Sequence, residues 1–365
     1  MNRTDPKSNA PIMMLSAGNG FIMQSEKYSR DNAGQSLKKY ILLKQGELAY
    51  NHGASKAKQF GCCYELTEPE ARIPYVYHCF KINDHEYTPF IAMALNNAKM
   101  DKQLKRLVSS SVRMDGLLNI SFEDYMSVTL HLPSSTEQKH IADFLKKIDE
   151  RIAAQEKLLA SLKKYKRGVV DGIFSRKLNF SYPQTWAELE ISELFMPISD
   201  KGYSDKIVLT IVQGEGTMPR DSVDRRIAYD KSTISSYKRV LPNDFILHLR
   251  SFEGGLEIVN EEGVVSPAYT ILRARNEIIP LFFYTFFRSY WFINSKLRIS
   301  VEGIRDGKSI NMNTFWHIKV PVPSIEEQRH ISALISSIDN RIKIAEFEYK
   351  RLLQIRVGLM QQLFI

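Results

Sequence analysis

Two stretches of the chain decide its architecture. Residues 133–175 read PSSTEQKHIADFLKKIDERIAAQEKLLASLKKYKRGVVDGIFS, and residues 323–365 read PSIEEQRHISALISSIDNRIKIAEFEYKRLLQIRVGLMQQLFI. They align without a gap at a constant offset of 190 residues, so that Gln138 and Asp149 correspond to Gln328 and Asp339. A match of this length is an internal repeat, and repeats organise the whole fold.

Both stretches have the apolar spacing of a coiled-coil helix, in which steps of four and three alternate. About 40 helical residues at 1.5 Å each make a helix of roughly 60 Å. Gln155 interrupts the first apolar lane and is predicted to fix the register. The predicted seam positions are Ile141, Leu145, Ile148, Ile152, Leu159 and Leu162 in the first helix and Ile331, Ile335, Ile338, Ile342, Tyr349 and Leu352 in the second.

The two helices are expected to pair with each other. Helices of an ordinary bundle hairpin follow one another through a short loop, whereas residues 178–322 separate these two. Because the seams match, an intramolecular antiparallel coiled coil with pseudo-twofold symmetry is the natural solution.

The segments outside the helices indicate two mixed α/β globules. Short β-type runs alternate with turns rich in Gly, Asn and Asp, and the order of features is similar in both. The fold class is therefore α+β. The predicted domains are 1–132, a first globule that is short at its N-terminus, 133–177, a first spacer helix, 178–322, a second globule, and 323–365, a second spacer helix.

Composition narrows the function classes. The 365 residues include 50 Lys and Arg against 41 Asp and Glu, a net charge of +9 that suits a nucleic-acid backbone. No apolar run has the roughly 20 residues that a membrane span needs, and a cytoplasmic location is expected. The three cysteines form no CxxC pair, so no metal site is predicted.

Enzymatic motifs are not found. Gly303–Ser309 reads GIRDGKS, with three residues between its glycines where a phosphate-binding loop has four. The sequence also lacks the Asn/Asp-Pro-Pro-aromatic tetrad that amino-methyltransferases use, and it lacks the motifs GxSxG and HExxH. We therefore expect a chain with no catalytic residues and no cofactor of its own.

Basic and polar side chains in turns are the candidate DNA-binding residues, because they can reach phosphates and base edges. Solvated surface charge is the competing interpretation for each one. The clusters stand out because they fall at corresponding places in both globules. The candidates are Asn51, His52, Ser55, Lys56, Lys58 and Arg113 in the first globule, and Arg220, Arg225, Arg226, His248, Arg250, Ser251, Arg305 and Lys308 in the second.

The whole pattern resembles the specificity (S) subunit of type I restriction-modification systems. The residues that carry the resemblance are LPSSTEQKHIADFLKKIDERI, VSPAYTILR, IRDGKSINMNTFWHIKVPVPS and EEQRHISALISSIDNRI. The resemblance covers nearly the whole chain and is strongest in the helices. It departs from the family at its start, where no segment matches the Trp-containing Thr185–Phe195.

The resemblance implies that each globule is a target recognition domain for one half of a split double-stranded DNA site. It also implies two modification (methyltransferase) subunits, which would bind S-adenosylmethionine, and restriction/translocase subunits. The chain itself would be a non-catalytic, sequence-specific subunit that scaffolds them. A truncated or silent recognition cassette and a coiled-coil adaptor that binds protein partners only are the alternatives left open.

Overall fold

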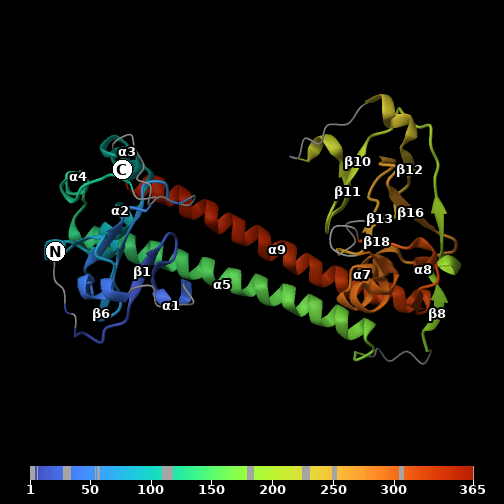
Figure 1. The fold of residues 1–365 in the computed structure, drawn as a ribbon, viewed down its shortest axis with the longest axis horizontal. Helices are drawn as coiled ribbons and strands as arrows, with labels where there is room; N and C mark the ends of the chain where they lie inside the picture. The colour runs from blue at the N-terminus through green and yellow to red at the C-terminus, as the bar shows by residue number, and fades with distance from the viewer. Residues whose placement is uncertain are drawn as a thin grey trace. The chain divides into compact units, whose positions relative to one another are not determined.

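The computed structural model describes residues 5, 7–27, 34–53, 55, 58–108, 118–178, 185–223, 231–248, 253–303 and 308–364. The chain divides into two compact units. Unit 1 comprises Met1–Glu156 and Phe347–Ile365, and unit 2 comprises Lys157–Glu346. Two long helices, α5 (Ser135–Phe174) and α9 (Ile325–Leu363), each begin in one unit and end in the other (Figure 1). The α+β class predicted from the sequence is confirmed.

Unit 1 is built from short antiparallel strands and helices. A three-stranded sheet has the order β5-β4-β7, and β1 pairs with β2 and β3 with β6. The strands are β1 (Met13–Ser16), β2 (Gly20–Met23), β3 (Ile41–Lys44), β4 (Leu48–Asn51), β5 (Cys62–Glu65), β6 (Glu70–Ile73) and β7 (His78–Phe80). The helical segments are α1 (Gln24–Lys27), η1 (Gly34–Lys39), α2 (Thr88–Ala94), α3 (Ala98–Leu107) and α4 (Phe122–Met126).

Unit 2 repeats this plan with additions. Its main sheet has four strands in the order β14-β13-β16-β9, and β10 pairs with β11, β12 with β15, β17 with β18 and β19 with β8. The strands are β8 (Ala187–Glu190), β9 (Phe195–Ile198), β10 (Leu209–Val212), β11 (Gly216–Pro219), β12 (Lys238–Val240), β13 (Phe245–His248), β14 (Glu257–Ile258), β15 (Gly263–Val265), β16 (Tyr269–Ala274), β17 (Val301–Glu302), β18 (Ser309–Ile310) and β19 (Lys319–Val322). The helical segments are α6 (Ile191–Leu194), η2 (Arg220–Ser222), η3 (Lys231–Ser236), α7 (Pro280–Phe287), η4 (Phe292–Lys296), η5 (Leu297–Ser300) and α8 (Met312–Trp316).

The addition in unit 2 is the segment β8–α6–β9. It joins two parts of the unit, because β9 pairs with β16 and β8 pairs with β19. Arg275 strengthens the join, since its backbone N–H donates to the Leu194 carbonyl at 2.8 Å. Among the described residues of unit 1, no strand corresponds to β8 or to β19.

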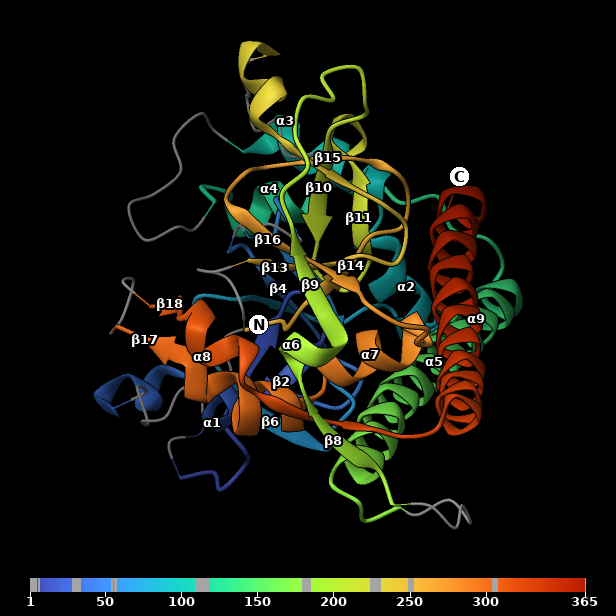
Figure 2. The same ribbon diagram turned by 90° about the vertical axis from the view of Figure 1, so that its right-hand side faces the viewer.

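The long helices pair in antiparallel fashion in both units. In unit 1, Asp149 of α5 accepts hydrogen bonds from Arg356 of α9, and Gln155 Nε2 donates to Glu348 Oε2 at 3.2 Å. In unit 2, Lys166 Nζ lies 2.6 Å from Asp339 Oδ1, and Lys163 Nζ lies 2.7 Å from Glu346 Oε1. Residue numbers rise along α5 as they fall along α9, and Figures 1 and 2 both show the helices side by side.

The buried face of each long helix follows the alternating steps of four and three. In unit 1, Leu145 is 2% exposed and Ile141 lies partly buried against the same core. In unit 2 the second helix contributes its deepest residues, Ile331, Ile335, Ile338 and Ile342, while Leu159 and Leu162 pack against the same cluster. The remaining seam positions, Ile148, Ile152, Tyr349 and Leu352, are half-buried.

Each globule has its own hydrophobic core. In unit 1 the residues around Tyr50, Phe90 and Tyr125 include Phe364, which directly follows α9 and whose ring centroid lies 5.0 Å from that of Phe90. In unit 2 the core is rich in phenylalanine and includes Phe174 from the end of α5. In the part of the chain that the structure describes, no helix is long and apolar enough to cross a membrane.

Candidate nucleic-acid interface

The loop that follows β4 in unit 1 holds four of the predicted DNA-binding residues. Asn51, the last residue of β4, accepts a hydrogen bond from the Gly53 N–H through its Oδ1 at 3.0 Å. The Ser55 hydroxyl accepts one from the Lys58 N–H at 3.0 Å, and Lys58 Nζ donates to the Asn96 carbonyl at 2.8 Å. Ser55 stays exposed, and Lys58 is tied to the turn between α2 and α3.

His52 is the first residue of this loop. Its side chain is only 6% exposed, and Nδ1 lies 3.0 Å from the Leu118 carbonyl. The ring centroid of His78 is 5.0 Å away. In this structure the His52 imidazole contacts the protein interior, so its predicted role at the DNA would require the loop to rearrange.

An aromatic cluster supports the loop from below. The rings of Tyr50 and Tyr125 stack at a centroid distance of 3.9 Å. Burial lowers the pKa of His78, and it raises the pKa of Cys62 to about 11 and that of Cys79 to about 12. Because these thiols are protonated near neutral pH, they are packing groups and weak nucleophiles.

In unit 2 two predicted residues, Arg220 and His248, each have a relation to Tyr269. The His248 ring, at the end of β13, lies 5.3 Å from the Tyr269 ring. Burial raises the pKa of Tyr269, and the nearby positive charge of Arg220, the first residue of η2, opposes that shift. The strand end of β13 in unit 2 corresponds to that of β4 in unit 1, so both units place polar side chains at the same corner of the fold.

The remaining predicted residues are spread along other turns. Lys308 is exposed next to β18. The assignments of all fourteen residues stay predictions, and seven of them lie outside the described part of the chain: Lys56, Arg113, Arg225, Arg226, Arg250, Ser251 and Arg305.

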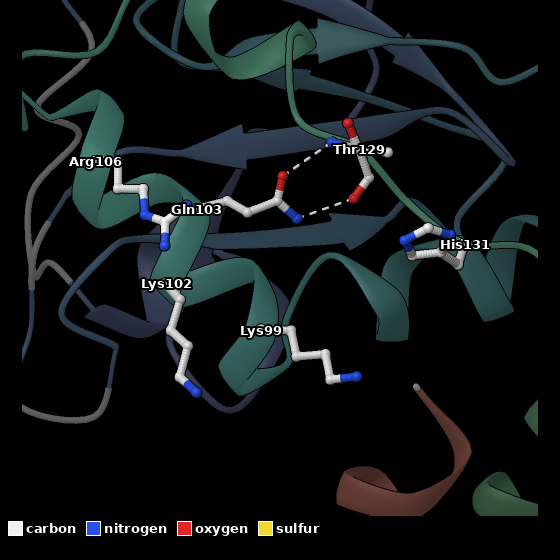
Figure 3. A pocket seen from close by; sticks show the side chains of 6 residues that line it. All are labelled: Lys99, Lys102, Gln103, Arg106, Thr129 and His131. Atoms are coloured by element: carbon white, nitrogen blue, oxygen red, sulfur yellow. Dashed lines mark hydrogen bonds between the residues drawn. The ribbon is translucent and has the colours of Figure 1, made fainter.

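The sequence reasoning missed a basic hollow in unit 1. Lys99, Lys102 and Arg106 extend from α3, and His131 lies across from them (Figure 3). The Gln103 amide holds the hollow in shape, since it accepts from the Thr129 N–H at 3.0 Å and donates to the Thr129 carbonyl at 2.9 Å. The spacing of three cations along one helix, at steps of three and four, was the signal that could have found it.

Two equivalent glutamines fasten the globules to the long helices. Gln138 and Gln328 are both 1% exposed. Through Oε1, Gln138 accepts from the Tyr87 N–H at the start of α2, and Gln328 accepts from the Ile279 N–H at the start of α7, each at 3.0 Å. Their Nε2 groups donate to the carbonyls of Pro133 and Pro323. Within each unit, the globule is thus hydrogen-bonded to the first turn of the helix that follows it.

Metal ligands do not gather in the described residues, where no group of three His, Cys, Asp or Glu side chains is placed to hold an ion.

Known proteins similar to this chain include the following three. A putative type I restriction enzyme MjaX specificity subunit from Methanocaldococcus jannaschii is 21% identical over 300 residues, which cover 77% of this chain and 68% of that protein. The HsdS subunit from Thermoanaerobacter tengcongensis has a similar fold, with a TM-score of 0.52 and 13% identity over all of this chain and 93% of its own. The S subunit of a type I restriction-modification system from M. genitalium gives a TM-score of 0.50 and 17% identity, with coverage of 99% and 90%.

A sequence profile described as type I restriction modification DNA specificity domain matches residues 43–164 and 183–354, one match for each globule and most of the helix that follows it. The chain belongs to the type I restriction-modification DNA specificity domain family.

Proposed function

We propose that this chain is a non-catalytic specificity subunit that reads a bipartite double-stranded DNA target, with one half-site for each globule. The observation that carries the proposal is the duplication itself. Two globules built on a common plan occur in a single chain, and in the sequence of each a polar stretch follows the equivalent strands, β4 and β13. Such a chain suits a target with two separate parts.

Linking the two readers strengthens binding without new contacts. Once one globule binds its half-site, the second binding event is intramolecular, and its effective concentration is set by the connection. Basic residues on the loops would supply much of the affinity by neutralising phosphates, which makes binding fall with salt. The net charge of +9 supports this part of the proposal.

We further propose that two modification subunits and restriction/translocase subunits dock on the chain in the cytoplasm. The long helices expose large apolar side chains outside their seam positions, and a docked partner would cover them. S-adenosylmethionine would be bound by the modification subunit and not by this chain. The exposed residues include Leu158, Tyr165 and Ile344 in unit 2 and Phe347, Leu353 and Val357 in unit 1.

The decisive experiment is selection of duplexes from a random pool by the chain together with its methyltransferase partner. We expect two short motifs at a fixed separation. Inserting one heptad into both long helices should change that separation and leave the motifs unchanged. Enrichment of no sequence would favour the protein-only adaptor, and enrichment of a single motif would mean that one globule is silent.

Lys308 offers a test at the level of one residue. Its exposed side chain is predicted to contact a phosphate, so Lys308→Ala should weaken binding to all sequences alike. It should also reduce by about one the steepness with which the logarithm of the binding constant falls with the logarithm of the salt concentration. Lys319→Ala, at another exposed lysine of the same unit, is the matched control. An unchanged slope in Lys308→Ala would remove this residue from the interface.

A further inference from the structure

The two units differ along one strand. Residues 319–322 of unit 2 form β19, which is paired with β8, while the corresponding residues of unit 1, 129–132, have no partner strand among the described residues. In unit 1 the Thr129 N–H and carbonyl are taken by Gln103. The backbone groups of Leu130 and Leu132 make no hydrogen bond within the described part of the chain. A row of unpaired strand groups is a template for another strand.

Apolar side chains are exposed around the same strand. Met126, Leu132 and Phe144 of unit 1 are 48%, 41% and 48% exposed. Their counterparts in unit 2 are Trp316, Val322 and Leu334, and all three pack against the hydrophobic core of that unit together with Trp186 and Leu189, of which Leu189 belongs to β8. In unit 2 the corresponding side chains therefore share one core with the segment that pairs with the strand.

The charges next to residues 129–132 are complementary to those of the segment that pairs with β19 in unit 2. The segment in unit 2 reads WAELEISEL over residues 186–194 and carries three glutamates. Glu188 lies 4.0 Å from Lys296, and Glu190 lies 2.9 Å from the His317 ring.

In unit 1, Thr129 and His131 line the basic hollow with Lys99, Lys102 and Arg106 (Figure 3). Neither the three cations Lys99, Lys102 and Arg106 nor His131 forms an ion pair with another described residue.

The register in unit 2 places acidic and apolar groups on opposite faces of the covering strand. Glu190 is opposite Lys319, Leu189 is opposite Val320 and Glu188 is opposite Pro321. The same register in unit 1 would set a carboxylate beside Thr129, another beside His131, and a leucine over Leu130. The face that meets the hollow would be acidic, and the face that meets the core would be apolar.

We infer that residues 128–132 of unit 1 are the acceptor edge for an acidic, amphipathic β-strand of a partner polypeptide, with glutamates at alternate positions and leucine between them. Backbone pairing supplies affinity in such strand addition, and the alternating side chains supply specificity. The inference concerns a protein partner and stands apart from the proposed reading of DNA.

The probe is a fluorescent peptide of residues 185–194, TWAELEISEL, added to the full chain. We expect saturable binding to one site, weakened roughly tenfold or more when Leu189→Asp in the peptide buries a charge against the core. In the chain, Leu132→Asp should have the same effect. Tyr75→Asp, which changes a 52% exposed side chain elsewhere in unit 1, should leave peptide binding unchanged.

A disulfide cross-link tests the register. In unit 2 the Ile191 N–H donates to the Ile318 carbonyl at 3.0 Å, so the pair 319/190 faces without backbone hydrogen bonds and has its Cα atoms about 4.5 Å apart. That distance permits a disulfide. The chain variant Thr129→Cys should cross-link faster to the peptide variant Glu190→Cys than to Glu188→Cys, and the three native cysteines are buried.

Several outcomes would overturn the inference. Equal cross-linking in both registers, or no saturable binding up to about 1 mM peptide, would show that the edge is not an acceptor. A dimer of the chain that the peptide dissociates would make a second copy, and not a different polypeptide, the occupant. Duplex DNA bound at Lys99 and Lys102, with no in-register cross-link, would assign the hollow to phosphates.

Discussion

The two globules of this chain share a common plan but build it with different side chains, and helices α2 and α7 show this best. Phe286 and Phe287 of α7 are fully buried, whereas the corresponding residues of unit 1 are Ala94 and Leu95. Unit 1 compensates with the stacked pair of Tyr50 and Tyr125. The pattern of apolar positions is therefore shared between the units, and the volume at each position is not.

A turn near the start of each globule shows that polar contacts, too, are shared in position but differ in chemistry. Gly18 and Gly214 have φ angles of +92° and +91°, and each donates its N–H to a side chain of the neighbouring strand. The acceptor is the Tyr64 hydroxyl at 3.1 Å in unit 1 and the Glu257 carboxylate at 3.0 Å in unit 2. Glu257 is also bound by Arg288 and by the Tyr284 hydroxyl, so unit 2 uses a buried ionic network where unit 1 uses one neutral group.

The chain carries a separate probe for each unit. All three tryptophans belong to unit 2, and all three cysteines belong to unit 1. Tryptophan fluorescence therefore reports the unfolding of unit 2, and the rate of thiol labelling reports the opening of unit 1.

The largest effect is expected from the phenylalanine core. Phe287→Ala should destabilise unit 2 by about 3–5 kcal/mol, because it leaves a cavity among closely packed rings. The matched change in unit 1, Leu95→Ala, removes a smaller side chain that is 7% exposed, and should cost about 2–3 kcal/mol. Urea denaturation followed by the two probes gives both values. Equal losses of unfolding free energy from the two substitutions would contradict the proposed difference between the two cores.

The second prediction compares the two acceptors of these turns, the Glu257 carboxylate in unit 2 and the Tyr64 hydroxyl in unit 1. Breaking a buried ion pair costs about 3–5 kcal/mol, and the Arg288 side chain is 24% exposed, so Glu257→Gln should fall at the low end, ~3 kcal/mol. Tyr64→Phe removes one neutral hydrogen bond and should cost about 1 kcal/mol. The same denaturation experiment measures both. A larger loss from Tyr64→Phe would reverse the comparison.

The third prediction concerns acid. Burial lowers the pKa of His78 in the folded protein, so the unfolded chain binds its proton more readily. The stabilising contribution is complete above the unfolded value of about 6.5 and is lost as the pH falls from there toward the folded value. Acidification should therefore increase the opening of unit 1. The rate of thiol labelling, corrected for the smaller thiolate fraction at low pH, should rise as the pH falls. His78→Gln should remove this rise while Ile120 keeps a donor.

The smallest effect is expected from the repeated ion pairs of the helices. Lys166 with Asp339 and Arg356 with Asp149 occupy equivalent positions of the repeat, and their side chains are about one third exposed. Exposed pairs contribute about 0.5 kcal/mol, and salt screens them. Double-mutant cycles in low and high salt should give similar small coupling energies for the two pairs. A strong coupling in only one of them would show that the helices are not equivalent.

The repeat and its heptad spacing made the long helices predictable. Their apolar residues recur at fixed steps, and Pro133 and Pro323 mark where each begins. The α+β class also followed from short strand-like runs between turns. The exact strands did not, because pairs such as β8 with β19 join residues about 130 positions apart and leave no local pattern.

Site residues were harder to predict than elements. Residue type and turn context selected His52, yet tertiary packing buries its side chain, which the sequence around it does not signal. Lys58 was chosen as a DNA-binding residue, and in the structure its ammonium group donates to the Asn96 carbonyl. The basic hollow was missed because His131 comes from a distant segment and meets the lysines of α3 only in the folded chain.

The division of the chain sets an order for its synthesis. Unit 2 is one continuous stretch, Lys157–Glu346, and can close as soon as that stretch has left the ribosome. Unit 1 contains the first residues of the chain but needs Phe364 for its core, so the globule translated first is completed last. Until then, Phe90 and its apolar neighbours lack the side chain that completes their core.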